Sequence, residues 1–399
     1  MLRVHLSITT GESAVELRVR QIRTSTFKLG SIDLAHEQIQ CGVEMMQSKC
    51  CSSITLKCEE YMRKVRPLTI EKARRQQAAD EATDREQHAY QGLTGSMAWP
   101  AAQVMVHAAA TVSLAQAKAN KPTSQDMLEL NKGQRFMKAS ADVGLTFDAI
   151  ADRLGEVRIG IYWDASWATR PDGSSQGGYM IFLTTDEAIK DGYPMPLVVI
   201  DWASKKLPRV SRIALSSEAQ SGATAIDAFE WVKTMSALIL DPTRDPAAES
   251  TPQLAGQSPC ITDCKALYDA ARSSSCGRGI AEKRTAIEVM MMNERMQFIS
   301  VVWKWTNTTQ QLADGLTKLA VRQTFAEMMR RRWHALKFDP TFTAGKKLTQ
   351  KQKKDIDAEL ADAAADDGDA DNAYLADNGI IEDAHLVQDG KADISESHS

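Results

Sequence analysis

The chain has 399 residues, of which 43% are hydrophobic, and it carries a formal net charge of −4. This length allows two or three domains with a sizeable core. No run of 18 apolar residues occurs, so the sequence predicts no membrane span, and its first residues lack the apolar stretch of a secretory signal. Seven cysteines without a regular framework favour a reducing compartment. We therefore expect an intracellular protein, cytoplasmic or nuclear, and not a secreted one.

The net charge conceals an uneven distribution along the chain. From Asp355 to the end there are 14 acidic residues and one lysine, so residues 1–354 carry a net charge of +9. A basic body suggests a polyanionic partner, although ordinary surface charge explains it nearly as well. The acidic tail, residues 345–399, lacks the apolar residues that would offset the entropy of ordering. We expect it to be disordered.

The first part of the chain predicts mainly helix. Residues 1–26 show no strong period and stay unassigned, whereas residues 27–150 are expected to form a mostly helical region. Ala, Met and Leu dominate the stretch from Tyr90 to Ala119, which predicts two packed helices separated at Pro100. A further helix is expected to start after Pro122, with Thr123 or Ser124 as its N-cap.

The pattern changes at Glu156, and residues 156–333 alternate between strand-like and helix-like runs. A Pro-Asp-Gly turn at 171–173 predicts that the first two strands pair antiparallel. The order predicts an α/β domain with one five-stranded mixed sheet and helices on both faces. The expected strands are 157–163, 177–183, 197–202, 259–263 and 298–303, and the expected helices are 217–240, 266–271, 282–294 and 309–332.

Four short motifs in this segment each carry one acidic residue, and three of these acids lie directly beside apolar runs, where charge is costly unless it is paired. Carboxylates that converge there would repel one another unless a cation bound them. Such an arrangement suits two divalent metal ions in phosphodiester chemistry. Each acid also has a structural alternative as a turn cap, a capping box, a helix start or an i+4 partner of Lys318. The four acids, in the order of these alternatives and of the chain, are Asp164, Glu218, Asp263 and Asp314.

These motifs resemble the ribonuclease H domain of copia-type retrotransposon Pol polyproteins. Tyr-Trp-Asp-Ala-Ser-Trp-Ala at 162–168 is similar to the family's Asp-Ala-Asp-Trp-Ala, and Thr-Asp-Cys-Lys-Ala at 262–266 to Cys-Asp-Asn-Gln-Ser-Ala. Trp202 to Lys206 and Leu215 to Ala219 resemble its Trp-Ser-Ser-Lys-Lys and Leu-Ser-Ser-Thr-Glu-Ala runs. Gln-Leu-Ala-Asp-Gly-Leu-Thr-Lys at 311–318 resembles Gln-Leu-Ala-Asp-Ile-Phe-Thr-Lys, the most specific match.

The resemblance extends upstream of the acids. Residues 90–99 resemble the segment after the polymerase core of these polyproteins, and Gly144 to Phe147 fit its next helices. Residues 27–150 would then be a remnant of the thumb and connection of a reverse transcriptase. The Tyr-x-Asp-Asp motif of the polymerase is missing, so no polymerase activity is expected from this chain.

The resemblance implies a ribonuclease H-like fold and hydrolysis of the RNA strand of RNA–DNA hybrids. By the same resemblance, Asp164, Glu218, Asp263 and Asp314 would bind two Mg²⁺ ions, with Mn²⁺ as the alternative. The partners would be the hybrid and an upstream polymerase portion of the same element. The alternative is a catalytically silent, nucleic-acid-binding remnant. Residues 156–333 contain no histidine, which argues against a histidine-based nuclease there.

Further residues are candidates for nucleic-acid contacts by their position alone. Selectivity for RNA needs contacts to 2′-hydroxyl groups across a shallow minor groove, for which Ser166, Ser217 and Lys265 are placed near the acids. A basic cluster precedes the helix of Glu218 and could follow backbone phosphates, with a solvated loop as the alternative. Its members are Lys205, Lys206, Arg209 and Arg212.

Overall fold

The structure is a computed structural model, and its description covers most of the chain between residues 37 and 335. The unassigned segment 1–26 and the acidic tail 345–399 lie outside the described residues. Among the described helices, none combines the length and the apolar character needed to cross a membrane. The described ranges are 37–50, 52–148, 157–185, 194–241, 243, 245, 258–273 and 276–335.

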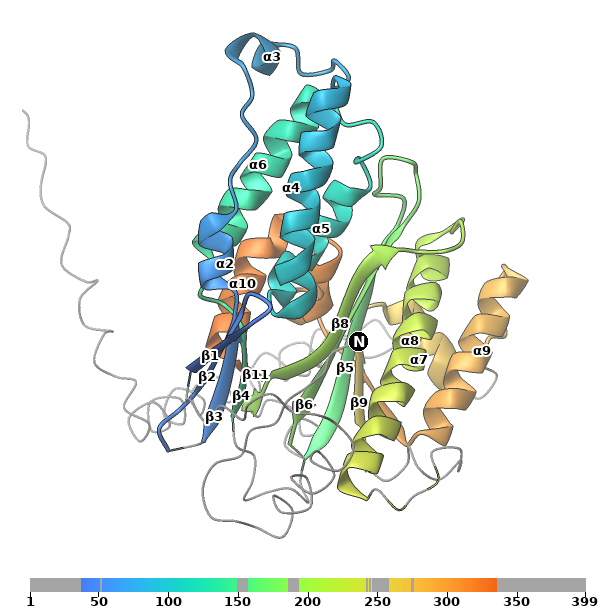
Figure 1. Ribbon diagram of the computed structural model, residues 1–399. Helices are drawn as coiled ribbons and strands as arrows, with labels where there is room; N and C mark the ends of the chain where they lie inside the picture. The colour runs from blue at the N-terminus through green and yellow to red at the C-terminus, as the bar shows by residue number, and fades with distance from the viewer. Residues whose placement is uncertain are drawn as a thin grey trace, which may run out of the picture. The chain divides into compact units, whose positions relative to one another are not determined.

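The upstream region, which we define as residues 37–148, combines a small antiparallel sheet with a group of helices (Figure 1). Its sheet has the order β1-β2-β3-β4. The strands are β1 Glu37–Gln40, β2 Val43–Gln47, β3 Ser53–Lys57 and β4 Leu145–Asp148. The helices are α2 Glu59–Lys64, α3 Lys72–Gln76, α4 Asp84–Gln103, the 3-10 helix η1 Val106–Ala108, α5 Ala109–Gln116 and α6 Ser124–Ala139.

Local sequence signals account for several helix ends in this region. Thr83 caps α4 and Thr123 caps α6, each through a capping box that a carboxylate three residues later completes. The predicted N-cap at Thr123 is therefore confirmed. Helix α4 continues through Pro100 and ends at Gln103, with Val104 as its C-cap, so the break between the two predicted helices falls after the proline.

One prediction for the upstream region is wrong. The segment from Gly144 to Phe147 was expected to be helical, but its residues from Leu145 onward form β4. Thr146 and Phe147 pair with Thr55 and Ile54 of β3. β-branched and aromatic side chains suit a half-buried strand once a partner strand offers an edge. That partner lies far upstream in the chain, beyond the reach of a local pattern.

The central sheet has the strand order β10-β9-β5-β6-β8. Strand β6 runs antiparallel to both β5 and β8, whereas β9 runs parallel to both β5 and β10. This arrangement confirms the predicted five-stranded mixed sheet. The bounds are β5 Arg158–Ser166, β6 Gln176–Thr184, β8 Val198–Lys206, β9 Ser258–Thr262 and β10 Val301–Trp305; the short strands β7 Pro194–Pro196 and β11 Trp333–Ala335 pair separately.

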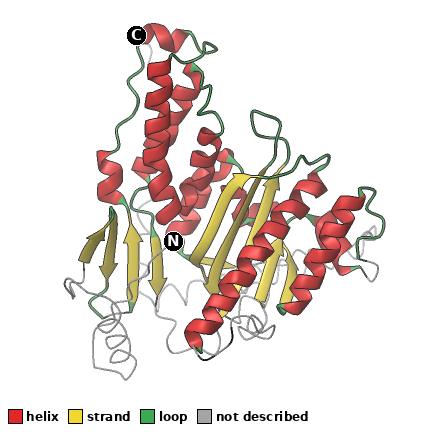
Figure 2. Cartoon of the chain, turned by 45° about the vertical axis from the view of Figure 1, so that its right-hand side comes forward, coloured by secondary structure: helices red, strands yellow, loops and turns green. Residues whose placement is uncertain are grey.

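Successive residues of a strand point to opposite faces of its sheet, and this alternation divides the core in two. The face that carries Ile161, Trp163 and Ile181 packs against the long helix α7, Ala214–Leu240, and against α9, Lys283–Phe298. Helix α8, Lys265–Arg272, completes this layer (Figure 2). We call this cluster the α7-side core.

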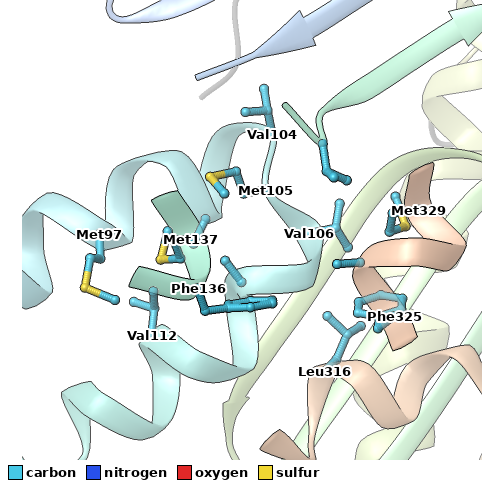
Figure 3. Packing of buried hydrophobic residues seen from close by; sticks show 14 of the residues in the cluster. Met97, Val104, Met105, Val106, Val112, Phe136, Met137, Leu316, Phe325 and Met329 are labelled. Atoms are coloured by element: carbon cyan, nitrogen blue, oxygen red, sulfur yellow. The ribbon is translucent and has the colours of Figure 1, made fainter. Parts of the chain in front are cut away.

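The opposite face carries Tyr162, Met180 and Phe182, and the upstream region covers part of it. These side chains belong to one hydrophobic cluster with Val104 and Val106, which we call the upstream-side core. Figure 3 shows Val106 beside the C-terminal residues Phe325 and Met329 of the same cluster. The Trp202 indole of β8 also donates to the Ala101 carbonyl oxygen at 3.0 Å. Helices on both faces are thus confirmed, and the upstream helices supply part of one layer.

The predicted closing helix at 309–332 is wrong over its first half. Gln311 caps the turn at Leu312 through its side chain, and Gly315 lies against the Phe325 ring, where an added Cβ would come within 2.2 Å of Cδ1. These contacts fold the chain into 3-10 turns before a shorter helix begins. The elements are η5 Thr308–Gln310, η6 Leu312–Leu316, η7 Leu319–Val321 and α10 Arg322–Arg331.

Candidate active site

Asp164 lies within β5, near its C-terminal end, and only 1% of its surface is exposed. Its carbonyl oxygen accepts a hydrogen bond of 2.8 Å from Ser221 of α7. Its neighbour across the antiparallel pair is Gly178 of β6. Pairing with β6 and the hydrogen bond from α7 therefore fix the backbone of this acid.

Asp263 follows directly after β9, the strand parallel to β5. The Trp305 indole donates to its carbonyl oxygen at 3.0 Å, and Gln311 donates to its Oδ1 at 3.5 Å. The same Gln311 amide also donates to the Trp163 carbonyl oxygen at 3.0 Å. Gln311 thus connects the carboxylate of Asp263 to the strand that holds Asp164.

Asp314 reaches the same place from η6. One carboxylate oxygen from each of Asp164, Asp263 and Asp314 lies within 4.8 Å of the others. Both Asp164 and Asp314 are buried, whereas Asp263 is half-buried. Three predicted site residues from separate parts of the chain are therefore brought together at one end of the central sheet.

Glu218 approaches from the opposite face of the sheet on α7, and it does not belong to the group of three. Its Oε1 accepts from the Ala165 backbone N–H at 3.3 Å. Its Oε2 is buried and has no hydrogen-bond partner among the described residues. A buried carboxylate oxygen without a partner is costly, so this oxygen is suited to accept from a ligand.

Crowding and burial disturb the ionisation of these acids. Burial raises the pKa of Asp314 to about 7, and the nearby charge of Asp164 adds to the shift. Burial raises the pKa of Glu218 well above its usual value, and Asp164 and Asp263 raise it further. The pKa of Asp164 is also raised by burial, although Lys318 and Thr317 act against the shift. A cation that bound these groups would favour their charged forms.

Two residues beside Asp314 partly offset this accumulated charge. The Lys318 ammonium lies 2.7 Å from Asp314 Oδ1 and 3.5 Å from Asp164 Oδ2. The Thr317 hydroxyl donates to Asp164 Oδ2. The pairing of Asp314 with Lys318 at i+4, considered as a structural alternative, is therefore present together with the clustering of the acids.

The donor set suits a hard divalent cation. Carboxylate oxygens are the ligands that Mg²⁺ and Mn²⁺ prefer. Asp164, Asp263 and Asp314 supply such oxygens at close range, and the unpartnered oxygen of Glu218 supplies one more nearby. The residues present thus fit a site for divalent metal ions.

The predicted basic cluster lies partly on β8 and not wholly in a loop. Lys205 and Lys206 are exposed at the end of that strand, and Lys206 pairs with Asp172. Arg212 is exposed in the segment before α7. Arg209 forms an ion pair with Glu288 of α9.

The three other predicted contact residues differ in their surroundings. Ser166 is buried at the end of β5. Ser217 is fully buried, and its hydroxyl donates to the Ala214 carbonyl oxygen at 2.7 Å within α7. Lys265 forms an ion pair with Asp269 on the surface of α8.

Sequence reasoning did not place Gln311, Thr317, Lys318 and Ser221 in the site, and it considered Lys318 only as an i+4 partner of Asp314. All four contact the acids directly. The first three stand in the same motif as Asp314, so their positions next to that acid were a usable signal. Ser221 lies three residues after Glu218 on α7, the spacing of side chains on one helix face. The sequence offered no comparable signal that Trp167, three residues after Asp164, would be 47% exposed and would donate its indole N–H to the Ser211 carbonyl oxygen at 2.9 Å.

Comparison with known proteins gave distant structural similarities. No family model and no curated protein matches the sequence. An N-terminal RNase H domain from Mycobacterium tuberculosis, solved as a fusion with maltose-binding protein, is 13% identical with a TM-score of 0.25 and covers 44% of this chain and 97% of its own. RNase H1 from Halobacterium salinarum is 12% identical with a TM-score of 0.26, covering 42% and 98%. The protease–reverse transcriptase of prototype foamy virus is 14% identical with a TM-score of 0.24, covering 44% and 20%.

Proposed function

We propose that this chain is a metal-dependent endonuclease that hydrolyses the RNA strand of RNA–DNA hybrids. The observation that carries the proposal is the convergence of Asp164, Asp263 and Asp314 within 4.8 Å, with Glu218 beside them. These acids come from four motifs that resemble those of a ribonuclease H. They meet on the five-stranded mixed sheet that the resemblance implied.

The four acids would hold two Mg²⁺ ions, with Mn²⁺ as an alternative. Ions bound there would supply an activated water and would stabilise the departing 3′ oxygen of the RNA strand. The protein itself keeps the ligands in place: Gln311 holds Asp263, and Thr317 holds Asp164. Carboxylates positioned before the metal arrives lose less entropy when they bind it.

The substrate surface would extend from the acids over the exposed basic side chains. Lys205, Lys206 and Arg212 are exposed and suited to contact backbone phosphates. Ser166 and Lys265 lie close in sequence to Asp164 and Asp263, and we propose them for contacts to 2′-hydroxyl groups. Ser217 is less suited to this role because its hydroxyl is bonded within α7.

We further propose that the chain derives from a copia-type retrotransposon Pol polyprotein, with an upstream polymerase portion of that element as a partner. The order and spacing of the four acidic motifs support this origin. The upstream region would be the remnant of the thumb and connection. An intracellular location, cytoplasmic or nuclear, belongs to the same proposal.

A cleavage assay tests the proposed activity. The full chain is incubated with an RNA–DNA hybrid labelled on the RNA strand, with Mg²⁺ or with EDTA. We expect cleavage with Mg²⁺ alone, and no detectable cleavage by Asp164→Asn because this change removes a ligand charge at the centre of the cluster. Asp269→Asn removes a charge from the exposed face of α8 and should cleave like the wild type.

Two outcomes would contradict the proposal. Absence of cleavage in Mg²⁺ and in Mn²⁺, with the hybrid still bound, would favour the non-catalytic remnant. Equal cleavage by the wild type and Asp164→Asn would show that the carboxylates do not carry the reaction.

A further inference from the structure

Lys318 occupies a position that no part of the proposed reaction uses. Its ammonium group contacts oxygens of two of the three clustered carboxylates, Asp314 at 2.7 Å and Asp164 at 3.5 Å. A divalent ion bound between the two acids would require oxygens of the same two carboxylates. A lysine ammonium and such an ion would therefore compete for the same ligands.

The local fold holds Lys318 in this position. The backbone N–H groups of Thr317 and Lys318 both donate to the Asp314 carbonyl oxygen, at 3.1 and 2.8 Å, and this turn places the lysine beside the acid. Its side chain is 35% exposed, so it also has a route to solvent. Lys318 can thus contact the acids or leave them without rebuilding η6.

The positive charge of Lys318 affects how the clustered carboxylates interact with one another. The clustered acids repel one another in a partly dehydrated site, and an internal cation reduces that repulsion. From this we infer that Lys318 is the counter-ion of the site without metal: it holds Asp164 and Asp314 together and must withdraw when a divalent ion binds. Lys318 is in this sense a positioning residue that sets the metal concentration at which the site fills. The inference rests on the proposed function because it takes the cluster to be a metal site.

Metal titration without nucleic acid tests this inference. Full-length protein is stripped with EDTA, dialysed and titrated with Mn²⁺, with free Mn²⁺ measured by electron paramagnetic resonance. We expect Lys318→Met to bind Mn²⁺ about tenfold more tightly than the wild type because the competing charge is gone. Lys318→Arg keeps the charge and should restore wild-type affinity.

Lys265→Met is the matched control. It removes the same charge next to Asp263, but the Lys265 ammonium pairs with Asp269 and not with the clustered acids. It should leave the Mn²⁺ affinity close to that of the wild type.

Thermal unfolding adds a second measurement. In EDTA, Lys318→Met should melt at a lower temperature than the wild type, and added Mg²⁺ should raise its melting temperature by more. If Lys318→Met does not fold in EDTA, Lys318→Gln, which keeps a hydrogen-bond donor, replaces it.

The results separate this inference from the proposed function. Equal Mn²⁺ affinity in Lys318→Met and Lys265→Met, weaker binding by Lys318→Met, or no Mn²⁺ binding by any variant would overturn the inference. Tighter binding by Lys318→Met in a protein that cleaves no hybrid would support the inference and count against the nuclease. Cleavage that requires Asp164, together with a Mn²⁺ affinity that does not depend on Lys318, would support the nuclease and overturn the inference.

Discussion

The two faces of the central sheet are covered in different ways. The α7-side core is built from segments that lie close together in the chain, since α7, α8 and α9 all come from the same part of the sequence as the strands. The upstream-side core joins strands β5, β6 and β8 to helices of the upstream region and to α10. One face is therefore complete within residues 157–335, whereas the other depends in part on the upstream region, which the sequence pattern had separated from the α/β domain.

The site lies where these two layers meet. Asp314 and Lys318 come from the layer on the upstream side, and Glu218 comes from α7 on the other side. Asp164 and Asp263 belong to β5 and to the end of β9 between them. We therefore expect changes on the upstream side to disturb the acids as well as the stability of the fold.

Removal of the upstream region should have the largest effect. A chain that begins at Val157 would uncover part of the upstream-side core, whose strand residues Tyr162, Met180 and Phe182 are fully buried in the intact protein. Because burial of apolar surface is the main driving force of folding, we expect this chain to lose cooperative unfolding. Thermal unfolding followed by circular dichroism measures this. A cooperative transition near that of the full chain would show that the two faces are equally independent.

Low pH should destabilise the upstream-side core more than the α7-side core. His107 is buried in this core with Nε2 3.0 Å from the Ser140 hydroxyl, and burial lowers its pKa to about 4. Because the folded state lowers this pKa, the neutral imidazole stabilises the fold fully above pH 6.5. This stabilisation is lost as the pH falls toward 4. By pH 4 the free energy of unfolding should have fallen by about 3 kcal/mol from this source. Residues 157–333 contain no histidine, so the α7-side core lacks this sensitivity.

Urea unfolding at pH 7 and pH 4 measures the effect, with His107→Asn as the test variant. The variant should lose less stability than the wild type over this range. The same pH dependence in both proteins would assign the acid sensitivity elsewhere. His334, whose pKa burial also lowers to about 4, is then the next residue to change.

A pair of adjacent glycines on β6 gives a smaller and sharper comparison. A Cβ at Gly178 would lie 2.6 Å from the Leu316 Cβ of η6, whereas one at Gly177 would lie 2.5 Å from Cδ2 of the Leu207 side chain. A flexible side-chain end can move, but a Cβ is tied to its backbone. Gly178→Ala should therefore lower the free energy of unfolding by about 1–3 kcal/mol more than Gly177→Ala does.

Gly178→Ala should also weaken Mn²⁺ binding because it displaces the turn that carries Asp314. Chemical denaturation and the Mn²⁺ titration together measure both effects in the two variants. Equal losses of stability, or full metal affinity in Gly178→Ala, would mean that η6 moves freely relative to β6.

Much of the central sheet could be predicted from the sequence because alternation and β-branching are local signals. The runs around Ile161 and Ile181 are examples, and the same signals placed Asp164 and Asp263 beside expected strands. The turns at 308–321 could not be predicted in this way. Their path depends on contacts such as that from Gln311 to Trp163, which lies 148 positions away in the chain.

The contact of Lys318 with two acids was equally hidden. The i+4 spacing indicated a pair with Asp314, but the second contact, with Asp164, arises only when β5 and η6 meet. The sheet itself could be predicted, but not the segment that covers its second face. Apolar alternation shows that a strand is buried without identifying its neighbour.

The upstream-side core has a consequence for cleavage of the chain. A protease that cut the polypeptide between Asp148 and Val157 would separate the two segments covalently but would leave their common hydrophobic cluster intact. The two pieces should then remain associated as a complementing pair after the cut. Mixing them as separate polypeptides could rebuild the acid cluster, as in a split enzyme.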